Sequence, residues 1–307
     1  MERRTFIGAS LAAGGTLLGG SAARALGADD VANPGEGEAG SVNQEVARER
    51  VLAGAINQSV CRWCYGKLTV EQLAAGAKRI GLKSVELLEP EEWPAVKAAG
   101  LTCGMVNAPG DPSIRLTSGF NHVENHARLV PLYLERIAWV NNAGLPNLIC
   151  FSGSRAGLSD EEGWANCAKG LAAILPAAER AGVTICMELL NSKVDHHDYQ
   201  CDHTTWGVAL VKRVASPRFK LLYDIYHMQI MEGDVVRTIT DNHEHIAHYH
   251  TGGVPGRHEI DDAQELHYPA VMRAIRDTGF TGFVAQEFIP TRDPLTSLAE
   301  AVKICTI

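Results

Sequence analysis

Four ionisable side chains in the second half of the chain each follow a short apolar run directly. They end the segments TICME, KLLYD, IAHYH and GFVAQE, and they are Glu188, Asp224, His250 and Glu287. Their separations of 36, 26 and 37 residues are each close to the length of one strand plus one helix. If the four segments are neighbouring parallel strands of a barrel, their C-terminal ends meet at one rim, where three carboxylates and one imidazole converge.

Such a cluster needs positive charge, because like charges brought this close repel each other. A divalent cation supplies that charge. Three oxygen ligands and one nitrogen ligand suit Mn, Mg or Co, with Zn possible. The sequence therefore predicts that Glu188, Asp224, His250 and Glu287 hold a divalent metal ion. The alternative is four separate rim residues, each bonded to a loop amide or to a nearby arginine.

The segments that position these residues are compact apolar runs that alternate with longer helical patterns. We expect the compact runs to be parallel strands covered on both faces, at residues 56–61, 84–88, 102–107, 147–151, 184–189, 220–224, 246–250 and 282–287. The helical patterns cover residues 69–80, 121–142, 159–181, 204–214, 234–242, 268–278 and 295–304. Eight strands without an interrupting linker predict a single-domain (β/α)8 TIM barrel of the α/β class. An open doubly wound sheet is the alternative, but it usually has a glycine-rich phosphate loop after its first strand, and CRWCYG at residues 61–66 is not such a loop.

The N-terminal residues differ in composition from the rest of the chain. Residues 1–28 place the pair Arg3 and Arg4 before a mildly apolar Ala/Gly/Leu run, which predicts a twin-arginine signal peptide. Residues 29–43 hold Pro, Gly and acids and predict a flexible linker, which leaves residues 44–307 for the barrel. We expect the chain to be periplasmic or otherwise exported. A retained membrane anchor is the alternative to a cleaved signal.

The composition and the charge limit the partners that we expect. The chain is 46% hydrophobic and 21% charged, as ordinary globular proteins are. Its formal net charge of −8 becomes −10 without residues 1–28, which carry three basic and one acidic side chain. Nucleic-acid-binding surfaces are normally basic, so we expect no nucleic-acid partner. We expect a small carbohydrate or keto acid as the partner and no stable membrane insertion after signal removal; a homo-oligomer is compatible with this composition.

The second half of the chain resembles the hydroxypyruvate isomerase branch of the xylose isomerase-like barrels, a group that includes sugar isomerases and ketose 3-epimerases. The segments that carry the resemblance are MEL at 187–189, DIYH at 224–227, HYH at 248–250, GRHE at 256–259 and QE at 286–287. The resemblance begins near residue 50 and is most specific between Glu188 and Glu287. One position departs from it, because hydroxypyruvate isomerases can carry Gln where this chain has His250, whereas ketose epimerases carry His.

The resemblance implies roles for individual residues. It implies that the four residues named above bind a metal, and that Glu188 and Glu287 also flank the substrate and carry its proton. It further implies that His227 and Arg257 bind substrate oxygens. Asn107, which ends the predicted third strand, is a candidate for binding a substrate hydroxyl.

These roles predict a metal-dependent aldose–ketose isomerase or epimerase that acts on a small sugar or hydroxy-keto acid. A metal that acts as a Lewis acid stabilises the enediolate formed when a carboxylate removes the proton beside a carbonyl. Return of the proton to the neighbouring carbon gives isomerisation, and return on the opposite face gives epimerisation. The alternatives are a lyase that acts on a keto-sugar or 3-keto-glycoside at the same site, a metal-dependent endonuclease, which the negative charge disfavours, and a non-catalytic carbohydrate-binding barrel.

Overall fold

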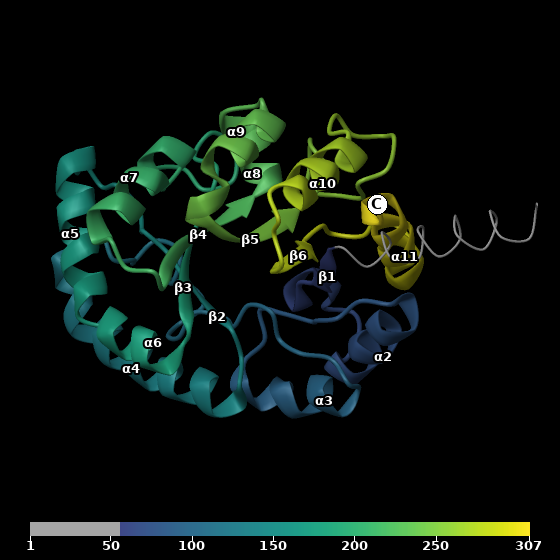
Figure 1. Ribbon diagram of the computed structural model, residues 1–307, viewed down its shortest axis with the longest axis horizontal. Helices are drawn as coiled ribbons and strands as arrows, with labels where there is room; N and C mark the ends of the chain where they lie inside the picture. The colour runs from purple at the N-terminus through teal and green to yellow at the C-terminus, as the bar shows by residue number, and fades with distance from the viewer. Residues whose placement is uncertain (1–55) are drawn as a thin grey trace, which may run out of the picture. The chain divides into compact units, whose positions relative to one another are not determined.

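Six parallel strands form the centre of the computed structural model, which describes residues 56–307 (Figure 1). They are β1 (Asn57–Val60), β2 (Asn147–Cys150), β3 (Thr184–Glu188), β4 (Phe219–Asp224), β5 (Ile246–Thr251) and β6 (Phe283–Gln286). Their hydrogen-bonded order is β1-β6-β5-β4-β3-β2, and every neighbouring pair is parallel. Each strand begins and ends within one residue of a predicted apolar run.

Two further segments, residues 84–88 and 102–107, close the sheet between β1 and β2; we call them the closing segments. A single parallel bridge links the first to Cys61, next to β1, and another links the second to Leu148 of β2. Two more bridges join the closing segments to each other. The predicted (β/α)8 TIM-barrel class is therefore confirmed for the described part of the chain.

The closing segments are not the regular strands that the sequence predicts. Leu87 has a left-handed φ of 55°, which interrupts an extended chain. The backbone of Gly104 bonds to side chains instead of a strand neighbour: its N–H donates to Ser84 Oγ (2.7 Å), and its carbonyl accepts from Asn147 Nδ2 (2.7 Å). Side chains thus replace part of the ladder here, and the pattern of apolar residues does not reveal this.

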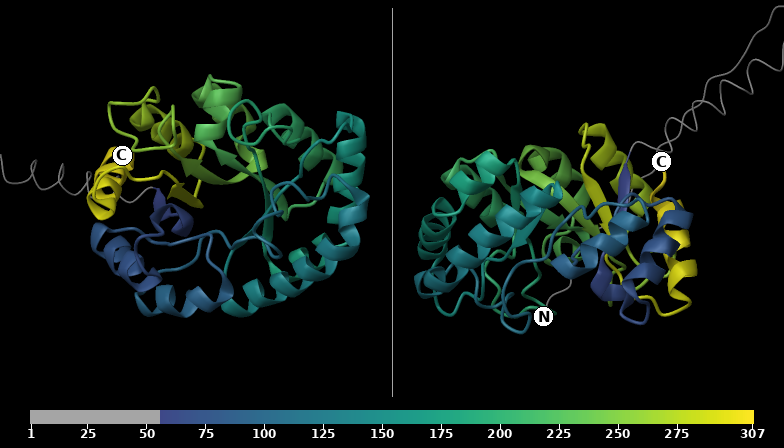
Figure 2. Two further views of the ribbon diagram at one scale, coloured as in Figure 1. Left: turned by 180° about the vertical axis from the view of Figure 1, so that it is seen from behind. Right: turned by 90° about the horizontal axis from the view of Figure 1, so that it is seen from below.

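Helices surround the strands on the outside, as both views in Figure 2 show. They are α2 (Val70–Ile80), α3 (Trp93–Ala98), α4 (His126–Ala143), α5 (Asp160–Ala172), α6 (Leu175–Ala181), α7 (Thr204–Val214), α8 (Ile225–Met231), α9 (Val235–Asn242), α10 (Tyr268–Asp277) and α11 (Pro294–Cys305), with short 3-10 helices η1 (Arg62–Tyr65), η2 (Pro90–Glu92), η3 (Val123–Asn125) and η4 (His243–His245). Thr69 and Ser159 begin α2 and α5 with capping boxes, as their sequences indicate.

Three helical predictions need correction. The predicted helix at 159–181 is two helices, α5 and α6, because Pro176 in the first turn of α6 has no N–H to continue the hydrogen-bond ladder. The predicted helix at 121–142 begins only at His126, after η3. The sequence analysis also missed α3 and α8, and α8 begins directly after the last residue of β4.

Buried aliphatic and aromatic side chains fill the described part of the chain, and several buried charged side chains lie at the C-terminal ends of the strands. The predicted signal peptide (1–28) and linker (29–43) lie outside the described residues. Between residues 56 and 307, no helix combines the length and the apolar character that crossing a membrane requires.

Candidate metal-binding active site

The structure brings Glu188, Asp224, His250 and Glu287 together at one end of four neighbouring strands. Glu188 and Asp224 are the last residues of β3 and β4, His250 lies in β5, and Glu287 directly follows β6. All four side chains are buried. One ligand atom from each lies within 4.8 Å of the others, so the four can share one metal ion.

The orientation of His250 fits a cation. Its Nδ1 lies 2.5 Å from Glu287 Oε2 and 3.5 Å from Glu188 Oε1. This buried nitrogen nevertheless has no partner in hydrogen-bond geometry among residues 56–307. A nitrogen and two carboxylate oxygens that converge without a well-formed hydrogen bond are the donor set that a divalent ion accepts.

Arg257 contributes positive charge to the same cluster. Its Nη2 donates to Asp224 Oδ2 (2.6 Å) and to Glu287 Oε2. The guanidinium also lies 4.8 Å from the ring centre of Tyr226 and 5.7 Å from that of Trp63. Only 11% of its side chain is exposed, so solvent screens these contacts little.

His227, at the start of α8, has nitrogen donors at both ring nitrogens. Asn191 Nδ2 lies 2.6 Å from its Nδ1, and Arg257 Nη1 lies 2.8 Å from its Nε2. The Asn191 amide is held in this orientation because its oxygen accepts from the backbone N–H groups of Val194 and Asp195. Burial lowers the pKa of His227 well below its usual range. A neutral ring accepts at only one nitrogen, so only one of these two donors can form a hydrogen bond with His227 at a time.

The two glutamates have pKa values that shift in opposite directions. Burial raises the pKa of Glu188 to about 7, and the charge of Glu287 adds to this effect. Burial also acts to raise the pKa of Glu287, but the Arg257 guanidinium and His250 outweigh it and hold that pKa well below its usual range. In the cluster without a cation, Glu287 is therefore the more readily ionised of the two carboxyl groups.

Trp63 follows β1 in η1, and Asn107 ends the second closing segment. Trp63 is 49% exposed, and its Nε1 donates to Glu287 Oε1 (2.6 Å), so it orients a predicted catalytic residue. Asn107 donates its amide to Glu89 Oε1 (3.0 Å), and its carbonyl accepts from Arg136. The Asn107 amide is therefore engaged by a neighbouring side chain in this arrangement.

Neighbouring loops hold the segment that carries Arg257. Its carbonyl accepts from Ile289 N (2.7 Å), just after β6. The Glu259 carboxylate accepts from the backbone and hydroxyl of Thr291 and from the hydroxyl of Ser297. Burial acts to raise the pKa of Glu259, but these hydrogen bonds lower it to about 2. Glu259 thus ties the Arg257 segment to the chain that follows β6.

Sequence reasoning missed three polar residues around the site: Glu86, His248 and Asn191. Glu86 and His248 are fully buried and joined by a hydrogen bond of 2.7 Å. A signal was present for both, because Glu86 interrupts the apolar run SVELL, and His248 lies two residues before His250, on the same side of a strand. Asn191 follows Glu188 by three residues and lies in a loop, where no periodic pattern marks it.

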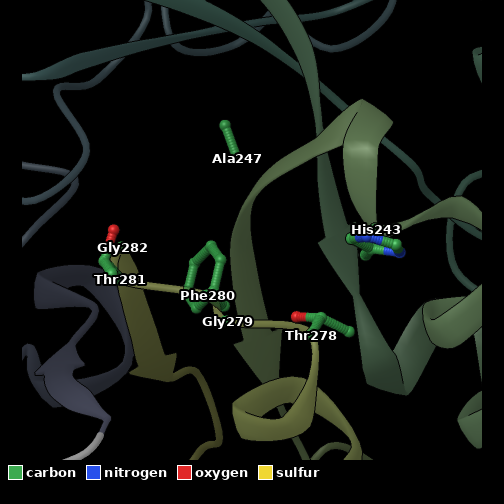
Figure 3. A pocket seen from close by; sticks show the side chains of 7 residues that line it. All are labelled: His243, Ala247, Thr278, Gly279, Phe280, Thr281 and Gly282. Atoms are coloured by element: carbon green, nitrogen blue, oxygen red, sulfur yellow. The ribbon is translucent and has the colours of Figure 1, made fainter.

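A separate pocket of about 370 Å³ opens among His243, Ala247 and residues 278–282 (Figure 3). These residues precede or begin β5 and β6, whereas the candidate site lies at the C-terminal ends of the strands. His243 is the one titratable residue that lines this pocket. The pocket therefore lies away from the cluster that can carry chemistry.

Comparisons with known proteins agree with this architecture. A family model described as "Xylose isomerase-like TIM barrel" matches residues 74–305. The 2-oxo-tetronate isomerase of Cupriavidus necator is 34% identical over 122 residues, which cover 40% of this chain and 46% of that protein, less than half of its length. The putative hydroxypyruvate isomerase of Homo sapiens is 25% identical over 241 residues, which cover 74% of this chain and 85% of that protein.

A solved structure supports the fold. The crystal structure of an AP endonuclease, family 2, from Brucella melitensis has a TM-score of 0.69 at 24% sequence identity. The likeness covers 80% of this chain and 98% of that chain. At this identity it supports the barrel and carries no argument about chemistry.

Proposed function

This chain belongs to the xylose isomerase-like TIM barrel family, and we propose that it is a metal-dependent isomerase or epimerase of a small sugar or hydroxy-keto acid. One observation carries the proposal. Two buried carboxyl groups, Glu188 and Glu287, converge with Asp224 and His250 in a cluster that can hold a metal. The names of two relatives, a 2-oxo-tetronate isomerase and a putative hydroxypyruvate isomerase, support isomerase chemistry on keto acids.

Glu188, Asp224, His250 and Glu287 would hold the divalent ion, with Mn, Mg or Co favoured by the oxygen-rich set and Zn possible. When bound, the ion supplies Lewis acidity to oxygens of the substrate, which makes the proton on the adjacent carbon easier to remove. Arg257 and His227 would bind substrate oxygens; both lie beside the cluster, since Arg257 contacts Asp224 and His227 contacts Arg257.

Glu287 and Glu188 would carry the proton. Each carboxylate could offer one oxygen to the ion and keep the other free, so one glutamate could remove the proton from carbon and the other could return one. Return to the neighbouring carbon completes an isomerisation, and return to the opposite face of the same carbon completes an epimerisation. The half-exposed Trp63 borders this space and holds Glu287 through its Nε1.

The test is product analysis in heavy water with manganese-loaded protein and a panel of keto acids, ketoses and 3-keto-glycosides. We expect an isomer or epimer that contains deuterium at carbon, unless a shielded carboxyl returns the original proton. Glu188→Gln and Glu287→Gln should each lower turnover by about 10²-fold or more while some metal stays bound. Glu265→Gln, which changes an exposed glutamate, is the matched control and should keep full turnover.

Three outcomes would contradict the proposal. Release of a fragment or an unsaturated sugar would identify a lyase. Binding of intact sugars without any turnover would identify a carbohydrate-binding barrel. Near-normal turnover of either Gln variant with metal bound would reduce that glutamate to a ligand.

A further inference from the structure

A fully buried carboxylate, Glu86, lies behind the candidate metal cluster. It belongs to the first closing segment, and β1 and β6 lie between that segment and β5. One of its oxygens, Oε1, contacts two ring nitrogens of β5: His248 Nε2 at 2.7 Å and His250 Nε2 at 2.9 Å. A carboxylate at this depth is costly unless its partners compensate it, so these two contacts need an explanation beyond packing.

The hydrogen bonds define where the protons lie. Glu86 Oε2 has no hydrogen-bond partner within residues 56–307, so a proton placed on it would be buried without an acceptor. Glu86 Oε1 can accept from both histidines only if each carries its hydrogen on Nε2. The nearby Cys61 Sγ lies 3.9 Å from Glu86 Oε1 and is at most a weak donor. The consistent assignment is an ionised Glu86 and an Nε2–H on both His248 and His250.

This assignment matters for the opposite side of the His250 ring. With the hydrogen on Nε2, Nδ1 has a free lone pair, and Nδ1 is the atom that lies 2.5 Å from Glu287 Oε2 and 3.5 Å from Glu188 Oε1. In the other tautomer Nδ1–H would point at these carboxylates and could not bind a cation. With a cation in the cluster the ring would carry a single hydrogen, and Glu86 is the acceptor in contact with Nε2.

We propose that Glu86 is a positioning residue that fixes the Nε2–H tautomer of His250 and so directs its Nδ1 lone pair at the metal cluster. The inference rests on the metal centre of the proposed function. Carboxylates that accept from the second nitrogen of a metal-bound histidine orient the ring and raise its basicity, and their loss typically costs about 10–100-fold in metal affinity. His248, which donates to the same oxygen, keeps Glu86 Oε1 in place.

The experiment measures metal affinity and tautomer separately. Binding of Mn²⁺ is titrated calorimetrically to the wild type, to Glu86→Gln and to the control Tyr249→Phe. Tyr249 lies between the two histidines in the sequence, and its buried hydroxyl has no hydrogen-bond partner within residues 56–307. We expect the Mn²⁺ dissociation constant of Glu86→Gln to rise about 10–100-fold. That of Tyr249→Phe should stay within about twofold of wild type, because no ligand contact changes.

The tautomer is read by ¹⁵N NMR of histidine-labelled, Mg²⁺-saturated protein, with the His250 signals assigned by their loss in His250→Gln. The cation is needed because burial acts to lower the pKa of His250, but Cys61 and Glu287 hold that pKa well above its usual range in the protein without a cation. We expect Nε2–H in the wild type and a shift toward Nδ1–H in Glu86→Gln. Wild-type protein with Nδ1–H would overturn the proposal even if Glu86→Gln fails to fold. A folded Glu86→Gln protein that keeps wild-type Mn²⁺ affinity would also overturn it. Absence of isomerase turnover alongside the expected affinity and NMR results would count against the proposed function alone.

Discussion

The buried contacts of Arg257 make a quantitative prediction about stability. In chelator-treated protein, Arg257→Met would leave Asp224 and Glu287 buried without the guanidinium that both of them contact. Met keeps most of the apolar stem of Arg257 and removes the guanidinium, which also lies over the rings of Trp63 and Tyr226, so the change acts mainly on charge. The left-handed φ of 57° at this position is common to both proteins and drops out of the comparison.

The expected size follows from the burial. Removing one partner of a buried ion pair costs about 3–5 kcal/mol, and the carboxylates here are at most 4% exposed. For a folded unit of this size, each kcal/mol shifts Tm by about 2–4 °C, so the chelated variant should melt about 6–20 °C lower than wild type. Protonation of a carboxyl in the cluster would place the result toward the lower end of that range.

Calorimetry with chelator and with saturating Mn²⁺ checks this. Because the ion supplies the missing positive charge, it should raise the Tm of Arg257→Met more than that of wild type. The matched control is Arg213→Met, whose pair with Glu161 is largely exposed and contributes about 0–1 kcal/mol. Equal Tm losses in the two arginine variants, or an equal rise with Mn²⁺ in wild type and Arg257→Met, would refute the electrostatic reasoning.

Three further predictions concern the metal ligands, Glu259 and the N-terminal arginine pair. Asp224→Ala should lose more metal than His250→Ala after dialysis, because it removes an anionic ligand, and full occupancy in both would place the ion elsewhere. The pKa of Glu259 is about 2 in the folded protein and near 4.5 in the unfolded chain, so the ionised carboxylate stabilises the fold above pH 4.5 and this stabilisation is lost as the pH falls toward 2. In denaturant titrations, the difference in unfolding free energy between wild type and Glu259→Gln should therefore become smaller from pH 4.5 to pH 2. We propose export by the twin-arginine route, and changing Arg3 and Arg4 to Lys should retain the precursor in the cytoplasm; unchanged export in cell fractionation would rule the route out.

The arrangement of the four central residues was predictable because short apolar runs in the sequence mark both the strands and the residues at which they end. Glu188 and Asp224 directly end buried runs, and a parallel barrel places all such ends on one rim. The break at Pro176 was also readable, since proline cannot continue a helix. Their roles as ligands and proton carriers stay predictions until the metal and the product are measured.

The residues that escaped prediction depend on contacts far away in the sequence. Glu86 meets His248 across 162 residues, and no local pattern records that meeting. The irregular closing segments depend on Asn147 and Ser84, whose side chains bond the backbone of Gly104. The family resemblance identified Arg257, but only the structure shows that its guanidinium contacts the carboxylates of Asp224 and Glu287.

The irregular pairing of the closing segments affects the local opening of the barrel. One isolated bridge joins each of them to its neighbouring strand and two join them to each other, so we expect their amide hydrogens to exchange with solvent through local openings that cost less than global unfolding. Glu86 lies in the first closing segment and contacts the imidazole of His250. Each local opening of the closing segments that moves Glu86 away would free the His250 ring to reorient. The rate at which bound metal exchanges would then depend on the local opening of these two segments and not on the stability of the whole barrel.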